Sequence, residues 1–526
     1  MSKKYTCIKC GIVAIAACLS ACAVGPDYKR PSTDVPDKYK ENAGWHEDWA
    51  QAQPADALKR GAWWEIFSDA KLDELEAQVD GANQSLAQAE AQYRQAAALV
   101  SQARSAFWPT LGVSASATRS GRYGNSGNII GNGGTVVTDP TGTGTGTGTT
   151  TTTTTPTTSG ARISTVYSLP LQASWEPDLW GKVRRSVEQQ AGNAQASEAT
   201  LESTRLSLHA ELATDYFQLR ILDEQKRLLD DTVDAYRKSL QLTQNQYNVG
   251  VAARADVVQA DTQLKTAQVQ AIDLGVQRTQ LEHAIALLIG KTPAEFSLEP
   301  TKFEIKPPAI PVGVPSQLLQ RRPDVAVAER QAMSANAQIG VAEAAWFPTL
   351  NLQAEGGYQS SSFSKWLTAP SRFWSIGPQL AETLFDGGLR HAQSAQARAA
   401  YDAAAANYRE VSLAAFQNVE DQLSALRILE AESAAQDDAV AAAELALKIA
   451  LNQYRAGTVS YINVVTAQTS AFSNERNSIS ILGNRLNYSV GLVKAIGGGW
   501  DETQLPAPHD IDSGSQAPKA AVTTKD

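Results

Sequence analysis

Two long stretches without proline most restrict how this chain can fold. Pro177 and Pro293 bracket 115 residues that contain no proline, and Pro378 and Pro506 bracket a further 127. Both stretches are rich in Ala, Gln, Leu, Glu and Arg, which are good helix formers. In the first stretch, apolar residues recur at steps of three, four and seven, which is coiled-coil spacing. They are Leu208, Leu212, Leu219, Leu222, Leu229, Val233, Tyr236 and Leu240.

Gly250 and Gly457 are expected to end two very long helices, because glycine is favoured just after a helix C-terminus. The two helices would run over 182–248 and 389–455. Each would be about 100 Å long at ~1.5 Å per residue. A shorter helix would return from each break, over about 253–290 and about 461–496. A compact globular domain cannot contain helices of this length.

The chain also contains an internal duplication. The segment FWPTL that begins at Phe107 is echoed by WFPTL at Trp346, 239 residues later. Further along, Gln246-Tyr247 matches Gln453-Tyr454 at an offset of 207. The first half therefore carries about 32 extra residues between these landmarks. They fall in 120–160, a Thr/Gly-rich segment with almost nothing to bury, for which we expect an exposed loop.

Runs of alternating apolar and polar residues flank this loop and its short counterpart in the second half. Their length of about ten residues suits tilted membrane strands and predicts one β-hairpin in each half, over about 109–176 and about 348–382. Alternation alone fits a soluble sandwich strand equally well, but the long flanking helices favour the membrane strand. The residues expected to face lipid are Leu111, Val113, Tyr167, Leu169, Leu171, Leu350, Leu352, Trp374 and Ile376.

The N-terminus resembles a bacterial lipoprotein signal. Three lysines precede the apolar run 11–19, which is too short to span a bilayer. The run ends in Leu-Ser-Ala before Cys22, so we expect cleavage after residue 21 and a diacylglyceryl and acyl lipid on Cys22. Two alternatives are ordinary cleavage at the Ala21-Cys22-Ala23 match and a lipid on Cys18.

No later window offers the ~20 apolar residues of a membrane helix, so a spanning element would have to be a β-barrel. Four strands from one chain cannot close a barrel whose smallest natural size is about eight. The sequence therefore requires an oligomer if it forms a barrel.

Composition argues against a nucleic-acid partner and a metal site. The net charge is −9, and no basic cluster resembles the stripe that a phosphate backbone requires. All four cysteines lie within the first 22 residues, and the five histidines are far apart in sequence. We therefore expect no disulfide framework, no metal and no cofactor.

Signals of catalysis are also absent. Gly290-Lys291-Thr292 resembles the end of a P-loop, but Ile285 stands where the first glycine is needed. The acid pairs at 230–231 and 437–438 fit a solvated helix face or a lumen wall, and His209 and His283 fit packing or pore-lining positions. We expect no catalytic residues and no enzyme.

Several motifs, in this order, resemble the outer-membrane factor family of tripartite efflux pumps, which is TolC-like and here of the OprM/NodT lipoprotein type. They are VGPDYKRP at 24–31, Trp63-Trp64 with Phe67, Leu72 and Leu75, WEPDLWG at 175–181, RPDV at 322–325 and LFDGG at 384–388. The resemblance covers about residues 22–499. It implies a mainly α protein with membrane β-structure: a homotrimer in which each chain gives four strands to one outer-membrane β-barrel, continued by a long periplasmic α-helical barrel.

The resemblance and the patterns together give a domain plan. A signal peptide at 1–21 precedes a lipid-anchored segment at 22–70. The first repeat spans 71–292, with its long helical hairpin over about 182–290. A Pro-rich linker at 293–316 leads to the second repeat at 317–499, with its helical hairpin over about 389–496. We expect a disordered tail over 500–526.

The expected function is that of an outer-membrane exit duct that passively conducts small molecules from the periplasm to the exterior. The resemblance implies a periplasmic adaptor protein and an inner-membrane pump of the resistance-nodulation-division type as partners. The alternatives are an exit duct for type I protein secretion and a lipid-anchored periplasmic scaffold without a pore.

Two sets of residues are expected to carry this function. The helix-hairpin tips Val249-Gly250-Val251 and Ala456-Gly457-Thr458 occupy equivalent positions in the duplication, and by resemblance they meet the adaptor. Leu447 and Leu451 share a helix face before Gly457, where the family often has acids, and could narrow the closed pore. From spacing alone, ordinary interhelical core fits this leucine pair equally well.

Overall fold

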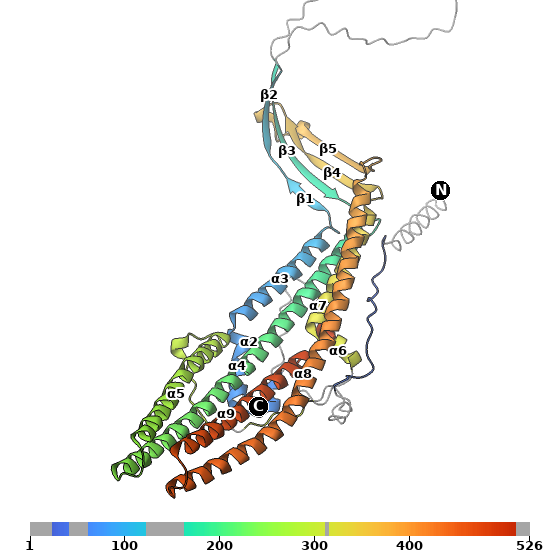
Figure 1. Ribbon diagram of the computed structural model, residues 1–526. Coiled ribbons are helices and arrows are strands. Elements are labelled where there is room, and N and C mark those ends of the chain that lie inside the picture. The colour runs from blue at the N-terminus through green and yellow to red at the C-terminus, as the bar shows by residue number, and fades with distance from the viewer. Residues whose placement is uncertain (1–23, 42–61, 123–161, 304, 311–314, 512–526) are drawn as a thin grey trace, which may run out of the picture. The chain divides into compact units, whose positions relative to one another are not determined.

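Two helices of 67 residues each form the largest part of the chain: α4 (Lys182–Asn248) and α8 (Leu389–Arg455) (Figure 1). They belong to a computed structural model that describes residues 24–41, 62–122, 162–303, 305–310 and 315–511. The bounds predicted from the sequence for both helices are confirmed. Cys22, the signal segment 1–21 and most of the Thr/Gly-rich segment lie outside the described residues.

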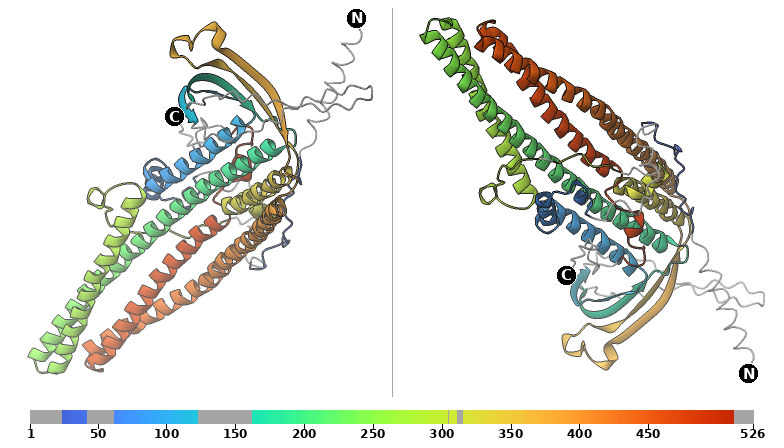
Figure 2. Two further views of the ribbon diagram at one scale, coloured as in Figure 1. Left: turned by 90° about the horizontal axis from the view of Figure 1, so that it is seen from above. Right: turned by 90° about the horizontal axis from the view of Figure 1, so that it is seen from below.

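Short helices pack end to end along the two long ones. Toward the tips, α5 (Arg254–Leu288) packs on α4, while α9 (Tyr461–Ala495) packs between α4 and α8. Along the other half, α3 (Gln84–Ser105) packs on α4, while α7 (Pro323–Ala344) packs between α4 and α8. Figure 2 shows α5, α4, α9 and α8 side by side in this order. In both halves of this helical wall, α8 stands at one edge.

The duplication is visible in the helix bounds. Both ends of α7 lie 239 residues after those of α3. Both ends of α8 and of α9 lie 207 residues after those of α4 and α5. The two offsets are those found in the sequence, so each half is built from one long helix and two short ones.

The chain divides into two units, of which the smaller holds all the described strands and comprises residues 106–179 and 347–385. Its antiparallel sheet contains β1 (Thr110–Val113), β2 (Ser116–Arg122), β3 (Arg162–Trp175), β4 (Thr349–Ser360) and β5 (Arg372–Ala381). Both β1 and β2 pair with β3, followed by β4 and β5. The two predicted hairpins are present, and β3 joins β4 across them.

The sheet has five strand segments where the sequence predicted four strands. β1 and β2 keep one continuous register on β3, and the interruption lies opposite Pro170. Proline has no N–H, so it cannot donate a ladder hydrogen bond. The amide of Ser114 still donates to the carbonyl of Pro170 (3.2 Å). The four predicted strands are therefore observed, and one of them is interrupted opposite Pro170, which has no N–H to donate.

The larger unit is held by one extended apolar core around the short segment η2 (Trp63–Phe67) and α2 (Ala70–Ala82). Trp63, Phe67 and Leu72 are buried against residues of α4, including Phe217, whose ring centroid lies 4.8 Å from that of Phe67. The apolar residues singled out after the anchor thus form the inner surface of this core.

The predicted disordered tail at 500–526 is wrong for residues 500–511. Trp500 packs with Ala199 and Ala326, and Ile511 is fully buried among residues of α3 and α4. Arg104 donates to the carbonyl oxygens of Pro508 (2.6 Å) and Ile511 (2.8 Å). Two isolated apolar residues and backbone acceptors hold the segment, and neither produces a periodic sequence signal. Residues 512–526 lie outside the described part.

Among the described residues, no helix is both long enough and apolar enough to cross a membrane.

Candidate functional site

The two helix-hairpin tips have the same backbone geometry. After α4, the amide of Gly250 donates to the carbonyl of Tyr247 (2.9 Å) and that of Val251 to Gln246 (2.9 Å). After α8, the amide of Gly457 donates to the carbonyl of Tyr454 and that of Thr458 to Gln453, both at 3.0 Å. This is the Schellman cap, which needs a left-handed residue. Gly250 (φ +79°) and Gly457 (φ +73°) provide it.

The tips present their side chains to solvent. Val249 and Val251 are 74 % and 70 % exposed, and Ala456, Gly457 and Thr458 are exposed as well. Exposed valines flanking a rigid cap are unusual for a plain turn, because removing apolar side chains from water lowers the free energy. The six residues predicted as tips thus form two similar, accessible surfaces.

Behind the tips, two tyrosines join the hairpins. The ring centroids of Tyr454 and Tyr461 lie 5.3 Å apart. Tyr461 and Ser239 of α4 lie within hydrogen-bond distance (3.2 Å), and Tyr454 donates to Thr243 of α4 (3.4 Å). The sequence comparison paired Tyr454 with Tyr247, yet Tyr454 is 5 % and Tyr247 41 % exposed. The halves therefore differ here, and sequence reasoning missed the tyrosine contact.

The two leucines predicted as a gate both lie on α8. Leu451 is partly buried and packs against the cluster formed by Ala260, Tyr454, Tyr461, Val464 and Val465. Leu447 is also partly buried, one turn earlier. The contact of Leu451 supports the interhelical-core alternative for that residue. The gate itself stays a prediction.

The strand register puts all nine residues predicted to face lipid on one face of the sheet. Residues paired across antiparallel strands share a face: Val113 pairs with Leu171, Trp175 with Leu352, and Leu350 with Leu380. Many of these apolar side chains are exposed; Leu111, Val113, Trp374 and Ile376 exceed 70 %. The opposite face carries polar residues such as Gln172, Asn351 and Glu355.

Aromatic side chains collect at both ends of this apolar face. At the end where β1 and β4 begin and β3 ends, Trp108, Phe347 and Trp175 are exposed. At the other end, the ring centroid of Tyr167 lies 5.4 Å from that of Phe363 and 5.9 Å from that of Trp366. Aromatic girdles flanking an apolar band are typical of proteins that span a bilayer with strands.

A polar ladder between α2 and α4, buried at its middle rung, was missed from the sequence. Tyr216 donates to Asp69 (2.6 Å), Nδ1 of His209 lies 2.6 Å from Oε2 of Glu76, and Arg205 donates to Asp80 (3.1 Å). The rungs are separated by seven and then four residues on both helices, as antiparallel packing requires. The matched spacing becomes visible only once α2 and α4 are known to pack together.

Burial and charge act against each other in the middle rung. Burial raises the pKa of Glu76 to about 7, although the nearby imidazole lowers it. Burial also lowers the pKa of His209, but Asp80 and Glu76 outweigh it and raise that pKa to about 9. Trp64 stacks on the imidazole with ring centroids 4.5 Å apart. The arrangement is that of a structural ion pair, because both side chains are buried between α2 and α4.

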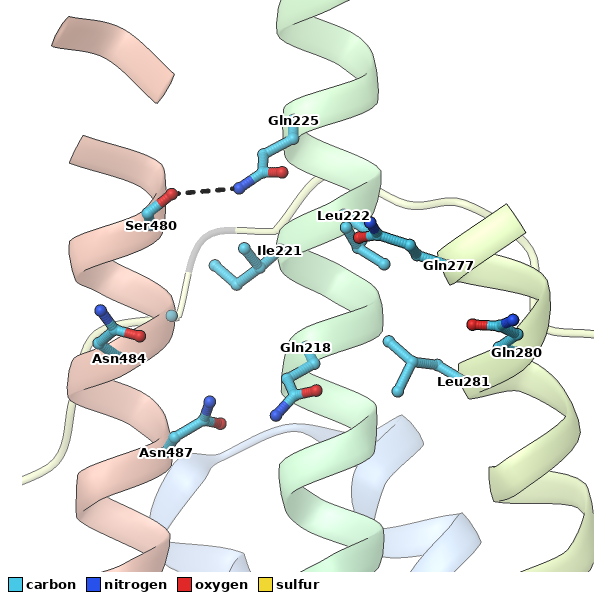
Figure 3. A pocket seen from close by; sticks show the side chains of 11 residues that line it. Gln218, Ile221, Leu222, Gln225, Gln277, Gln280, Leu281, Ser480, Asn484 and Asn487 are labelled. Carbon is cyan, nitrogen blue, oxygen red and sulfur yellow. Dashed lines mark hydrogen bonds between the residues drawn. The ribbon is translucent and has the colours of Figure 1, made fainter. Parts of the chain in front are cut away.

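A groove of about 480 Å³ lies between α4, α5 and α9 (Figure 3). Its polar lining consists chiefly of carboxamides, from Gln218, Gln225, Gln277, Gln280, Asn484 and Asn487. Gln225 donates across it to Ser480 (3.3 Å). Amides without a neighbouring acid, base or nucleophile cannot perform proton transfer. Within the described part of the chain, no group of His, Cys, Asp and Glu could hold a metal ion.

Comparison with known proteins gives one consistent result. Residues 77–291 and 314–498 both match the family described as outer membrane efflux protein. The solvent efflux pump outer membrane protein SrpC of Pseudomonas putida is 29 % identical over 492 residues, covering 92 % of this chain and 97 % of SrpC. The antibiotic efflux pump outer membrane protein ArpC of P. putida is 33 % identical over 348 residues, covering 66 % and 72 %.

Solved structures agree. The outer-membrane channel OprN is 28 % identical and superposes with a TM-score of 0.78, covering 91 % of this chain and all of OprN. The open state of the MtrE outer membrane channel of Neisseria gonorrhoeae is 25 % identical, with a TM-score of 0.75 over 91 % of this chain and 99 % of MtrE.

Proposed function

The chain belongs to the outer membrane efflux protein family and serves as the outer-membrane duct of an efflux pump; we propose that three copies close into one conduit, a twelve-stranded β-barrel continued by an α-helical barrel. The observation that supports this proposal is that the described part of each unit has two edges without a neighbouring helix or strand. The trimer number comes from the family resemblance.

The helical unit has free edges that carry apolar stripes. Val258, Val269, Ile272, Val276 and Leu287 of α5 are exposed, and their spacings keep them on one face at ~100° per residue. On the opposite edge, Leu413, Ile428, Leu445 and Ile449 of α8 form a second exposed stripe. Joining α5 of one copy to α8 of the next would cover both, and a head-to-tail contact of this kind closes a ring.

The sheet also has two unpaired edges. β1 and β2 form one edge and β5 the other, and within the described residues neither has a second neighbour. Exposed strand edges carry unsatisfied N–H and C=O groups, which a membrane does not tolerate. Pairing β5 with β1 and β2 of the next copy would satisfy them. The exposed apolar face would then contact lipid, and the polar face would line the lumen.

We propose that Cys22 carries the lipid and that the segment after it is tied to the helical unit. The amide of Val24 donates to the carbonyl of Trp180 (3.1 Å), and Arg185 donates to the carbonyls of Val24 (3.3 Å) and Gly25 (3.2 Å). Trp180 lies five residues after the end of β3 in the chain. A lipid two residues before Val24 would thus stay near the strand-to-helix connection.

The tips are the surfaces we propose for the adaptor, with an inner-membrane pump of the resistance-nodulation-division type beyond it. The exposed valines of the first tip and the matched caps of both tips support this assignment. The proposed closed pore is narrowed by Leu447 and Leu451 from three copies. Transport through the duct is passive, the family is not one of enzymes, and no cofactor apart from the lipid on Cys22 is proposed.

Efflux of small molecules is favoured over type I protein secretion because relatives are named for efflux of solvents and antibiotics. A scaffold without a pore would leave the exposed apolar face of the sheet unexplained. The cargo is expected to depend on the pump.

Docking is tested by cross-linking the full-length protein to its adaptor. Val251→Arg adds a bulky charge at an exposed site without disturbing the cap, and it should abolish both cross-linking and efflux while the isolated pore still conducts. Gly250→Asn is the matched control, because Asn tolerates the left-handed conformation. Undiminished cross-linking of the Val251→Arg protein would reject the tip as the docking surface.

A further inference from the structure

The two ends of the sheet unit differ in charge. Its cations with described side chains are Arg119 of β2, Lys365 of η4 (Phe363–Lys365) and Arg372 at the start of β5, all at the loop end. The acids at the strand ends are Glu176, after β3, and Glu382, after β5, both at the end that continues into the helices. The sheet is therefore cationic at one end and acidic at the other.

The cations lie just beyond the apolar face. The register pairs Arg372 with Tyr358 and Arg119 with Thr165, which puts both on the face that carries Leu171 and Ile376. Lys365 stands between Phe363 and Trp366, whose rings pack on Tyr167 of that face. Along the face, apolar side chains give way to aromatic ones and then to cations, although the exposed Ile163 lies one step beyond Arg119. Hydrocarbon, interface and headgroups follow the same order in a bilayer.

None of the three cations has a carboxylate within ion-pair distance in the described part of the chain, and all three are exposed. The guanidinium carbon of Arg372 lies 5.9 Å from the ring centroid of Tyr358, which fixes its direction without neutralising it. A row of unneutralised cations at the edge of an apolar face fits an anionic lipid surface.

We propose that Arg119, Lys365 and Arg372 bind the phosphate groups of anionic lipid headgroups at the loop end of the sheet. This inference rests on the proposed contact of the apolar face with lipid. Arginine suits this role because its guanidinium can bind a phosphate through two parallel hydrogen bonds. A lipid is favoured over a free phosphate because the cations are spread over two strands and a connection, rather than around one concave site.

The proposal is tested by titrating the purified full-length protein in neutral detergent with bis-phosphorylated lipid A and with its dephosphorylated form. Bound lipid is counted by native mass spectrometry. The phosphorylated lipid should bind more tightly. The triple variant Arg119→Gln, Lys365→Gln, Arg372→Gln should lose about fivefold in affinity for each cation, or on the order of a hundredfold in total.

A matched control removes three exposed cations from the helices, through Lys238→Gln, Lys265→Gln and Lys448→Gln. It should bind lipid as the wild type does. Three results would overturn the proposal: equal loss in the control, equal affinity for the dephosphorylated lipid, or full affinity in the triple variant. Displacement by inorganic phosphate at concentrations equal to those of the lipid would also overturn it.

Conductance separates this proposal from the proposed duct. The three cations lie on the outward face, so the triple variant should conduct like the wild type. A wild-type protein that does not conduct would contradict the duct, whereas a conducting triple variant with full lipid affinity would contradict only headgroup binding.

Discussion

Nδ1 of His209 lies 2.6 Å from Oε2 of Glu76, although the two residues are 133 positions apart. The pair is buried between α4 and α2 and joins the first residues after the anchored segment to one of the two longest helices. His209 has a second acceptor in Asp80, whose Oδ1 lies 3.4 Å from Nε2. This contact fastens α2 in a way that depends on protonation.

Attachment of α2 is predicted to weaken as the pH rises. The pKa of His209 is raised to about 9, so the stability it contributes is fully present below ~6.5 and is lost as the pH rises through about 9. The raised pKa of Glu76, about 7, acts in the same direction at lower pH. The free energy of opening of α2, obtained from hydrogen exchange of its amides, should therefore fall by on the order of 2 to 3 kcal/mol between pH 6.5 and 9.

His209→Gln should remove this pH dependence above pH 7, and His283→Gln, at an exposed position of α5, should not. Identical pH profiles for the wild type and His209→Gln would show that the imidazole does not control the attachment.

The packing of Gly340 and Arg185 against Val24 of the N-terminal segment is predicted not to tolerate an added methyl group on Gly340. A Cβ on Gly340 would lie 2.7 Å from Cγ of Arg185 and 3.0 Å from the carbonyl oxygen of Val24. Gly340→Ala should therefore destabilise the protein by about 1 to 3 kcal/mol, measured by denaturant unfolding. Gly275→Ala is the control, because nothing lies within 4 Å of its added Cβ and alanine favours a helix. If Gly340→Ala gains stability as Gly275→Ala does, the packing around Gly340 is not tight.

Charge on the apolar sheet face is predicted to be costly. Leu171→Arg should cost about 2 to 4 kcal/mol of stability in lipid, as measured by unfolding in vesicles. Gln172→Arg, one residue away on the polar face beside Glu355 (3.3 Å from Gln172), should be mild. Greater sensitivity at Gln172 would mean that the polar face, not the apolar one, meets lipid.

Leu447→Ser and Leu451→Ser separate a gate from a core. We expect both to raise conductance while the trimer persists, because a polar side chain removes the apolar narrowing. Leu451→Ser should also lower stability, since Leu451 packs against the cluster around Tyr454 and Tyr461. Bilayer recordings in which neither variant changes conductance would remove both residues from the gate.

The two long helices, α4 and α8, were predictable to the residue because their signals are local. Lys182–Asn248 contains no proline and is bounded by Gly181 and, one residue after its C-cap, Gly250, both of which adopt positive φ. The alternation correctly placed the nine residues predicted to face lipid on one common face of the sheet, because the side-chain period of a strand is two. The interruption between β1 and β2 could be predicted only once these segments were known to pair with β3 opposite Pro170.

Contacts between distant single residues were not predictable. The His209–Glu76 pair and the burial of Ile511 depend on which helices pack together, which no local pattern in one sequence records. The linker at 293–316 is similar: Leu298 and Ile310 are buried in the main core, yet its composition suggested only a connection.

The trimeric duct is tested most directly by single-channel recording of the purified full-length protein in a planar bilayer. The account predicts discrete conductance steps from a particle whose mass in detergent, corrected for bound detergent, equals three chains. Val251→Arg should retain these steps, because the tips dock a partner and do not form the pore wall. A trimer that inserts into the bilayer without conducting under any applied voltage, even with Leu447→Ser and Leu451→Ser combined, would contradict the account.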